Sequence, residues 1–269
     1  MSRFTAEWLA LRERHDLAAR NQNVLDAVIA SFKSRPEVRI LDLACGSGST
    51  LRALHTRLPG RQHWDLVDND PDLLALARNG VLDKDATLNT VRLDLNRNLE
   101  TALGASIDLI TTSALLDLVS KPWLDRLLRE IAARALPVYA ALTYDGRTDL
   151  SPADPFDAAV VSAVNAHQRI DKGFGPALGP SAAASAVTGF ESLGYSVISG
   201  YSDWIIGCDD RVMQAQLLDG WASAARDMGT LSGTDIADWL VRRRAAVAEG
   251  LSSMRVGHVD IFARPSSTR

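Results

Sequence analysis

The sequence predicts an α/β fold: a doubly wound, mostly parallel sheet of seven strands, with N-terminal helices and helical cap insertions. Short apolar runs that suit strands alternate with segments of helical spacing, a pattern typical of right-handed strand–helix–strand units. Three successive strand-like runs also end in an acid, and such acids meet at the ligand-binding edge of a parallel sheet. These runs are Ile40-Leu41-Asp42, Leu66-Val67-Asp68 and Val91-Arg92-Leu93-Asp94.

Each expected element follows from periodicity and local stop signals. Apolar residues at helical spacing predict two helices within residues 5–32, and Pro36 ends the second because proline disfavours helical backbone in the residue before it. Pro71, Gly80 and Thr234 suit a first helical turn, a C-cap and an N-cap. Further helices are expected at 50–58, 71–79, 121–135, 156–170, 181–193, 211–228 and 234–248. Strands are expected at 38–43, 63–67, 88–93, 107–111, 137–144, 195–206 and 256–263.

The 269 residues, 46% of them hydrophobic, are expected to form a single domain, 1–269. Within it, residues 1–35 are predicted to form an N-terminal helical cap and residues 36–147 the ligand-binding core. The regular alternation stops after residue 145, and connections as long as the one that follows are usually functional. Residues 148–180 and 208–252 are therefore predicted to be insertions that cover a substrate.

Composition and charge exclude several kinds of protein. A formal net charge of −4 indicates no broad basic surface, so we expect no nucleic-acid partner. Cys45 and Cys208 lie too far apart in the sequence to indicate a disulfide framework or a metal site. No apolar run approaches the roughly 20 residues of a membrane span, and the N-terminus shows no secretion signal. We expect a cytoplasmic protein with no membrane partner; the sequence leaves its oligomeric state open.

A sharp glycine turn follows the first predicted strand. Gly46 and Gly48 allow the backbone to turn and a ligand to approach closely. The nicotinamide fingerprint has a further glycine where this chain has Leu51, and Asp42 would repel a diphosphate, so both residues argue against a nicotinamide-dependent oxidoreductase. Asp68, about 20 residues after the turn, is placed to accept hydrogen bonds from both hydroxyls of a ribose.

The segment Asp42-Leu43-Ala44-Cys45-Gly46-Ser47-Gly48 carries a family resemblance. Residues 38–145 resemble the core of a class I, Rossmann-like S-adenosylmethionine-dependent methyltransferase, whose first motif is an acid followed by Gly-x-Gly-x-Gly. Ala44 stands where the first of these glycines is usual. The resemblance implies S-adenosylmethionine as cofactor and methyl transfer as the reaction.

The resemblance also implies roles for individual residues. Ala44, Gly46 and Gly48 would form the turn that approaches the methionine and ribose of the cofactor. Asp42 would help to hold the methionyl end, often through water, and Asp68 would bind the ribose hydroxyls. The alternative for each acid is an N-cap or a solvated loop.

Residues after the later strands would complete the cofactor site. By the same resemblance, Asn69 flanks the adenine, and Asp94 with Leu95 contacts it, the acid accepting from the exocyclic amine. Thr112 and Ser113 follow the fourth strand and would line the cofactor near the reacting methyl group.

Polar residues recur at helical spacing near the N-terminus, where such enzymes often carry a cap. They are Arg12, Asp16, Arg20 and Asn21. We predict that Arg20 binds the methionine carboxylate of the cofactor. The alternative is an exposed face of ion pairs.

A proton acceptor is expected in the insertions, because a hydroxyl or ammonium nucleophile must lose a proton during methyl transfer. His167 and Asp171 are four apart, so a helix would place them on one face, where the carboxylate orients the imidazole. The alternative is a helix-end pair without chemistry. Tyr144, at the end of the fifth strand, is expected either to face the substrate pocket or to pack in the core. His258 is expected to be structural.

The sequence thus predicts an enzyme that transfers a methyl group to the oxygen or nitrogen of a small molecule. Thr111-Thr112-Ser113 lacks the motif of exocyclic-amine methyltransferases, and no His/Cys/Asp cluster suggests a metal-dependent catechol enzyme. The alternatives are a non-catalytic or partner-regulating protein that binds the same cofactor, and an RNA methyltransferase.

Overall fold

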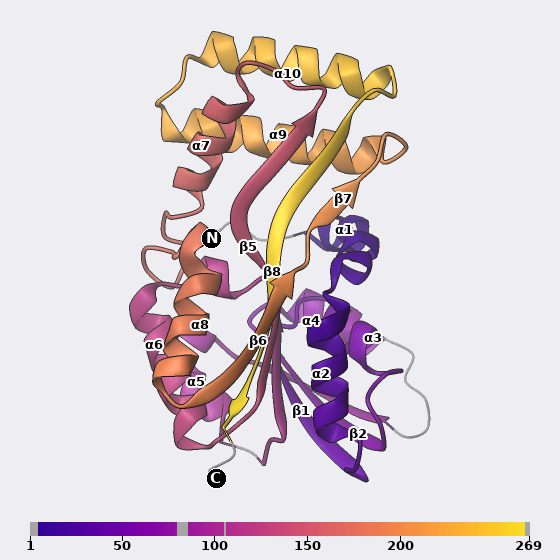
Figure 1. The fold of residues 1–269 in the computed structure, drawn as a ribbon, viewed down its shortest axis with the longest axis vertical. Coiled ribbons are helices and arrows are strands. Elements are labelled where there is room, and N and C mark those ends of the chain that lie inside the picture. The colour runs from indigo at the N-terminus through magenta and orange to yellow at the C-terminus, as the bar shows by residue number, and fades with distance from the viewer. Residues whose placement is uncertain (1–4, 80–85, 105, 267–269) are drawn as a thin grey trace.

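A mixed eight-stranded sheet forms the framework of the computed structural model, which describes residues 5–79, 86–104 and 106–266 (Figure 1). The strand order is β3-β2-β1-β4-β5-β8-β6, with β7 paired to β8. β8 runs antiparallel to its three neighbours, whereas β1 to β5 are parallel. The strands are β1 Glu37–Leu43, β2 Arg61–Asp68, β3 Ala86–Arg92, β4 Leu109–Ser113, β5 Val138–Ser151, β6 Tyr195–Tyr201, β7 Trp204–Ile206 and β8 Ser253–Pro265.

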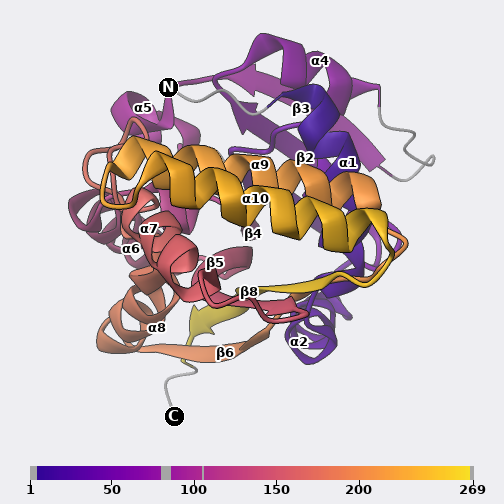
Figure 2. The same ribbon diagram turned by 90° about the horizontal axis from the view of Figure 1, so that it is seen from above.

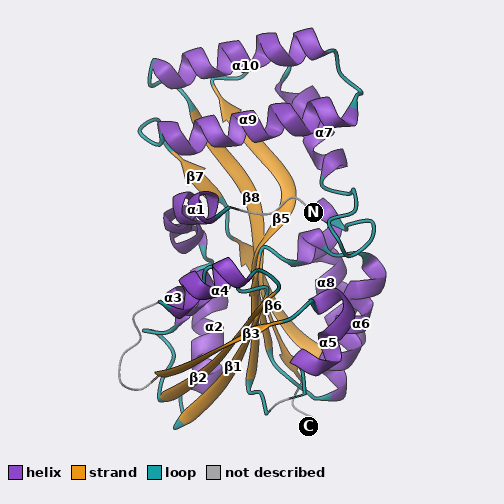
Figure 3. Ribbon diagram, turned by 180° about the vertical axis from the view of Figure 1, so that it is seen from behind, coloured by secondary structure: helices purple, strands orange, loops and turns teal. Residues whose placement is uncertain are grey.

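Helices cover both faces of this sheet, which confirms the predicted fold class (Figure 3). On one face, α2, α3 and α4 bury Val28, Leu54 and Leu74. On the other face, α5, α6 and α8 contribute to a second apolar cluster. The helices are α1 Ala6–Ala19, α2 Gln22–Phe32, α3 Ser49–Leu54, α4 Pro71–Arg78, α5 Leu95–Ala102, α6 Lys121–Ala133, α7 Asp157–His167, α8 Ala182–Ser192, α9 Arg211–Met228 and α10 Gly233–Ala248, with 3-10 turns η1 Leu116–Leu118 and η2 Gly179–Ser181.

The long strands β5 and β8 rise beyond the sheet and carry a helical layer made of α7, α9 and α10 (Figures 1 and 2). This layer has its own apolar core, in which Trp239 and Met213 are fully buried. The indole of Trp239 donates to Asp157 at 2.8 Å, and the buried Arg243 pairs with the same carboxylate. These contacts fix α7 against α10.

The path of β5 depends on Asp260. Its pairing with β8 shifts register between Ala140 and Thr143, where Leu142 has a φ of 54°. This left-handed conformation is unfavourable for a leucine. The fully buried Asp260 carboxylate accepts the Leu142 N–H at 2.8 Å and the Tyr139 hydroxyl at 3.1 Å. These bonds stabilise the bulge that redirects β5.

Several element boundaries differ from the predictions. α3 ends at Leu54, and the Gln62 side chain holds the turn that follows, since it donates to the carbonyls of His55 and Leu58, both at 2.9 Å. The strand expected at 195–206 is two strands, because the His258 N–H is bonded to the Asp203 carboxylate.

β5 and β8 are longer than the strands expected at 137–144 and 256–263, and further differences lie at helix ends. α5 was not predicted; it begins after Asp94, whose side chain accepts the Asn96 N–H at 2.9 Å. The N-cap of α10 is Ser232 and not Thr234. The C-cap predicted at Gly80 lies outside the described residues. In the described ranges, no helix has both the length and the apolar character to cross a bilayer.

Candidate active site

The turn after β1 is built from left-handed backbone. Ala44, Gly46 and Gly48 have φ values of 53°, 54° and 86°. Glycine adopts this region freely, whereas alanine is strained there by an amount on the order of 1 kcal/mol. The turn leads into α3, for which Gly48 is the N-cap residue.

The carboxylate of Asp68, at the end of β2, holds this turn. It accepts the Gly46 N–H at 2.8 Å and the Asp70 N–H at 3.0 Å. Burial raises the pKa of Asp68, and the hydrogen bonds from backbone N–H groups oppose that rise. Each carboxylate oxygen retains further acceptor capacity.

A cavity of about 210 Å³ lies over the turn, between the strand ends and α1; we call it the first cavity. Of the residues predicted to bind a cofactor, it is lined by Ala44, Gly46, Asp68, Asn69, Asp94, Leu95 and Ser113. The sheet edge therefore brings these predicted residues together around one space.

Four other predicted residues do not line the first cavity: Asp42, Gly48, Thr112 and Arg20. Asp42 is fully buried, and its Oδ1 accepts the Thr111 hydroxyl at 2.7 Å. Burial raises its pKa to about 7, against the opposing effects of Thr111 and Arg20. The Thr112 hydroxyl donates to the Leu43 carbonyl at 2.9 Å, so it joins β4 to β1. Gly48 supports the site only through the turn.

Arg20, predicted to bind the methionine carboxylate, does not line the first cavity, because its guanidinium is buried against Ser113; its role stays a prediction. It donates to the Ser113 hydroxyl at 3.1 Å and the Tyr139 hydroxyl at 3.3 Å. Two other cations do line the first cavity: Arg12, two helical turns earlier on α1, and Lys172. Arg12 donates to Asp16 at 2.9 Å, and its guanidinium lies 5.0 Å from the ring centroid of Trp204.

A second cavity, of about 770 Å³, adjoins the first. Arg12, Ala114, Leu118 and Lys172 line both cavities. The second cavity lies below the helical layer, and aromatic side chains from α1, β5, β7, α9 and β8 form much of its wall. These are Trp8, Tyr144, Trp204, Trp221 and His258.

Tyr144 lines the second cavity and also packs in the apolar core of the helical layer, and its catalytic role stays a prediction. Its hydroxyl donates to the Asn165 side chain at 2.8 Å. Burial raises the pKa of Tyr144 to about 12, so the phenol keeps its proton at neutral pH.

The predicted pair of His167 and Asp171 does not form, because α7 ends at His167 and Asp171 lies beyond it. The Asp171 carboxylate accepts the N–H groups of Gly173 and Gly175, at 2.6 and 3.0 Å, and thereby shapes its own loop. His167 instead lies 3.5 Å from the Lys172 ammonium. His167 and Asp171 both line the second cavity, and their catalytic roles stay predictions.

His258, expected to be structural, is part of the second cavity's wall. Its Nδ1 lies 3.1 Å from the Val256 carbonyl, an acceptor, so the proton is on Nδ1 and Nε2 has the lone pair. Burial, with the nearby Arg12 charge, lowers the pKa of His258 to about 3, so the ring is neutral. Its ring centroid lies 4.7 Å from that of Trp204.

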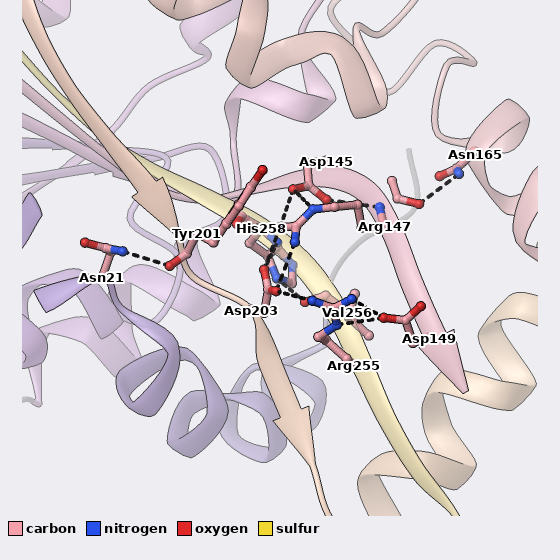
Figure 4. A network of polar contacts seen from close by, with 11 residues as sticks. Asn21, Asp145, Arg147, Asp149, Asn165, Tyr201, Asp203, Arg255, Val256 and His258 are labelled. Carbon is pink, nitrogen blue, oxygen red and sulfur yellow. Dashed lines mark hydrogen bonds and ion pairs between the residues drawn. The ribbon is translucent and has the colours of Figure 1, made fainter. Parts of the chain in front are cut away.

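A polar network fixes His258 from the outside of the sheet (Figure 4). The Asp203 carboxylate accepts the His258 N–H at 3.2 Å and an Arg147 Nη at 2.7 Å. Arg147 also donates to Asp145 at 2.6 Å. Gly257 leaves room for this network, because a Cβ there would clash with the Asp145 carboxylate. The network joins β5, β8 and the β6–β7 connection around the cavity.

Asp117, on η1, is a functional candidate that the sequence analysis missed. It is 6% exposed, lines the second cavity, and its Oδ1 has no hydrogen-bond partner among the described residues. Burial raises its pKa to about 6, and N–H donors together with Arg12 and Lys172 limit the rise. The sequence did contain a signal for it: an acid in the apolar run Leu115-Leu116-Asp117-Leu118, just after a strand of the parallel sheet.

The loop after α7 separates the two cavities. Lys172 faces both of them, and Phe174 lines the first and packs edge-on against Trp123 at 5.1 Å between ring centroids. The Gly173 carbonyl accepts the Asn96 side chain at 2.8 Å, which ties the loop to α5. Neither Lys172 nor Phe174 was predicted as a site residue.

Comparisons with known proteins agree with the observed fold. A family model described as a methyltransferase domain matches residues 40–137, whereas a search of curated proteins gave no match. A cyclopropane-fatty-acyl-phospholipid synthase-like protein from Lactobacillus casei has a TM-score of 0.50 at 15% identity, over 96% of this chain and 94% of that one.

Two further solved structures are similar at lower scores. An S-adenosylmethionine-dependent methyltransferase from Thiobacillus denitrificans, in complex with S-adenosylhomocysteine, has a TM-score of 0.45 at 13% identity, over 97% and 99% of the two chains. The YcgJ protein from Bacillus subtilis has a TM-score of 0.48 at 15% identity, over 92% and 100%.

The matched domain contains the glycine turn and the strand ends that surround the first cavity. At identities this low, the structural similarity supports the fold, and the family assignment depends on the matched domain. Residues 40–137 thus match a methyltransferase domain, and the chain has the Rossmann-like fold of such methyltransferases.

Proposed function

We propose that this enzyme methylates a small, largely apolar or aromatic molecule on a hydroxyl oxygen or an amine nitrogen. The observation that carries the proposal is the second cavity, which adjoins the first and shares four wall residues with it. Its volume of about 770 Å³ lies within the range of small-molecule sites.

The residues of the first cavity fit the cofactor. Four carboxylates, from Asp16, Asp68, Asp70 and Asp94, line it. Acids in this number suit a ligand with ammonium and sulfonium charges. Asp68 keeps acceptor capacity at the end of β2, the position suited to ribose hydroxyls.

When bound, S-adenosylmethionine supplies an activated methyl group for in-line displacement. The chain's own residues then orient the nucleophile and exclude water. Trp8, Trp204 and Trp221 provide flat apolar surface for the acceptor. Arg12 and Lys172 line both cavities, so they lie between the bound methyl acceptor and the cofactor.

A variant that fills the second cavity tests this proposal. Gly220 lies on α9 in the cavity wall, and a Cβ added there meets no atom within 4 Å. The assay measures S-adenosylhomocysteine release with a panel of phenols, alcohols and amines, and identifies products by mass. Gly220→Phe is expected to lower kcat/KM for an accepted compound by at least about tenfold, with cofactor affinity unchanged, because the side chain occupies acceptor space.

Gly233→Phe is the matched control, since a Cβ at Gly233 also meets nothing within 4 Å but this residue begins α10, away from both cavities. The proposal fails if Gly220→Phe keeps wild-type kcat/KM, or if RNA accepts methyl groups and no small molecule does. Cofactor binding without turnover of any acceptor would favour a regulatory role.

A further inference from the structure

Asp117 lines the second cavity, close in the chain to residues that line both cavities. It stands three residues after Ala114 and one before Leu118, both of which line both cavities. Its side chain is buried, and Oδ1 accepts no hydrogen bond from the described residues. An unpaired buried carboxylate oxygen is costly unless a ligand group satisfies it. A hydroxyl or amine of the molecule to be methylated would supply the hydrogen-bond donor that Oδ1 lacks.

We propose that Asp117 is the proton acceptor of the transfer reaction: its carboxylate receives the hydrogen bond, and then the proton, of the acceptor's hydroxyl or amine. This inference rests on the function proposed above. In the step, the nucleophile's lone pair forms a bond to the methyl carbon while the carbon–sulfur bond breaks. The bonding pair stays on sulfur, giving the neutral thioether, and the proton leaves the nucleophile for Asp117.

The charges around Asp117 suit this role. Arg12 approaches from α1 and Lys172 from the loop after α7, and both favour the ionised carboxylate. On β5, the Tyr144 backbone N–H donates to it, and the neutral His258 on β8 lines the same cavity. Burial opposes ionisation and raises the pKa to about 6. The group is therefore mostly ionised at neutral pH, yet more basic than an ordinary aspartate, as a general base requires.

The other titratable side chains of the cavity suit the role less well. His258 is a weak base, because its pKa is about 3. Tyr144 keeps its proton and uses it to donate to Asn165. Burial and Lys172 lower the pKa of His167, and the Asp171 carboxylate is bonded within its own loop.

The test uses a cofactor analogue, so it needs no knowledge of the acceptor. Sinefungin places an amine-bearing carbon where S-adenosylmethionine has its methylated sulfur. An ammonium at that position projects toward the reacting nucleophile, and a carboxylate close to it strengthens binding. Calorimetry measures Kd for sinefungin and for S-adenosylhomocysteine with wild type, Asp117→Asn and Asp171→Asn at pH 7.5.

Wild type is expected to prefer sinefungin, and Asp117→Asn to reduce that preference about tenfold while S-adenosylhomocysteine binding changes less than about twofold. Asp171→Asn should keep the preference for sinefungin, since the Asp171 carboxylate forms its hydrogen bonds within its own loop. With wild type alone, the preference should also decline as pH falls through about 6, where Asp117 gains its proton.

The outcomes separate this inference from the proposed function. S-adenosylhomocysteine binding with no sinefungin preference, or with a preference that Asp117→Asn keeps, overturns the role of Asp117 and leaves the methyltransferase site intact. If Asp117→Asn fails to fold, a wild-type preference that is constant from pH 5 to pH 8 overturns it equally. Failure of wild type to bind either ligand would contradict both.

Discussion

Replacing Asp42 with asparagine is expected to make the protein more resistant to unfolding at alkaline pH relative to wild type. Asp42 is fully buried, and burial raises its pKa to about 7 from a usual value near 3.8. Between these two values the folded state binds a proton that the unfolded chain does not. Wild type therefore loses stability as pH rises through this window, whereas the asparagine variant has no proton to lose at this position.

The size of the effect follows from the pKa difference. The difference between a pKa of about 7 in the folded state and one near 3.8 in the unfolded chain makes Asp42 worth about 4 kcal/mol of relative stability between pH 4 and pH 8. Asparagine keeps an acceptor for the Thr111 hydroxyl but places an amide near the unpartnered Oδ2 position. The resulting cost, about 1–3 kcal/mol, is independent of pH and does not alter the trend.

Urea unfolding at pH 5, 6, 7 and 8 measures the free energy of unfolding for wild type and Asp42→Asn. The difference between the two should change steadily with pH in favour of the variant. Asp209→Asn, at an exposed position, is the control and should give no such trend. A pH-independent difference for Asp42→Asn would refute the reasoning, because it would mean that the Asp42 carboxylate is solvated.

Three further predictions concern the turn, the helical layer and the cavity wall. Gly46→Ala should weaken S-adenosylmethionine binding measured by calorimetry, because alanine is strained at a φ of 54° and the Gly46 N–H holds Asp68; unchanged affinity would contradict the role of the turn. Arg243→Ala should lower stability by about 3–5 kcal/mol in urea unfolding, because it leaves the Asp157 carboxylate without its buried partner, whereas the exposed Arg244→Ala should have little effect. Trp204→Phe should cost about 1–3 kcal/mol, because Asp16 loses the indole donor at 3.0 Å; a melting temperature equal to that of wild type would argue against this bond.

Local patterns sufficed to predict the sheet and the residues that its strand ends bring around the first cavity. The acids at Asp68 and Asp94 follow strand-like runs, and the parallel sheet brings such strand ends together around the first cavity. The glycine turn is equally local, since Gly46 and Gly48 adopt the conformation that glycine favours. The strand order then follows from the preference for short, right-handed connections between parallel strands.

Contacts between distant elements could not be predicted in this way. The sequence pointed to Arg20 as the cofactor cation, and only the packing of α1 against β7 shows that Arg12 lines the first cavity whereas Arg20 does not. The pairing of His167 with Asp171 assumed a helix that continues past His167, but Asp171 forms its own turn with two glycine N–H groups. His258 lines a cavity because β8 continues beyond the sheet, which its periodicity does not reveal.

Calorimetric titration with S-adenosylmethionine and S-adenosylhomocysteine tests the central claim, that the first cavity holds the cofactor, most directly. Wild type is compared with Asp68→Ala and with Asp65→Ala, a control on the same strand that lies outside the first cavity. Wild type and Asp65→Ala should bind both ligands with similar affinity, and Asp68→Ala should lose about 100-fold or more, because charged acceptors of the ribose hydroxyls are removed. Equal binding by Asp68→Ala, or no binding by wild type, would contradict the assignment.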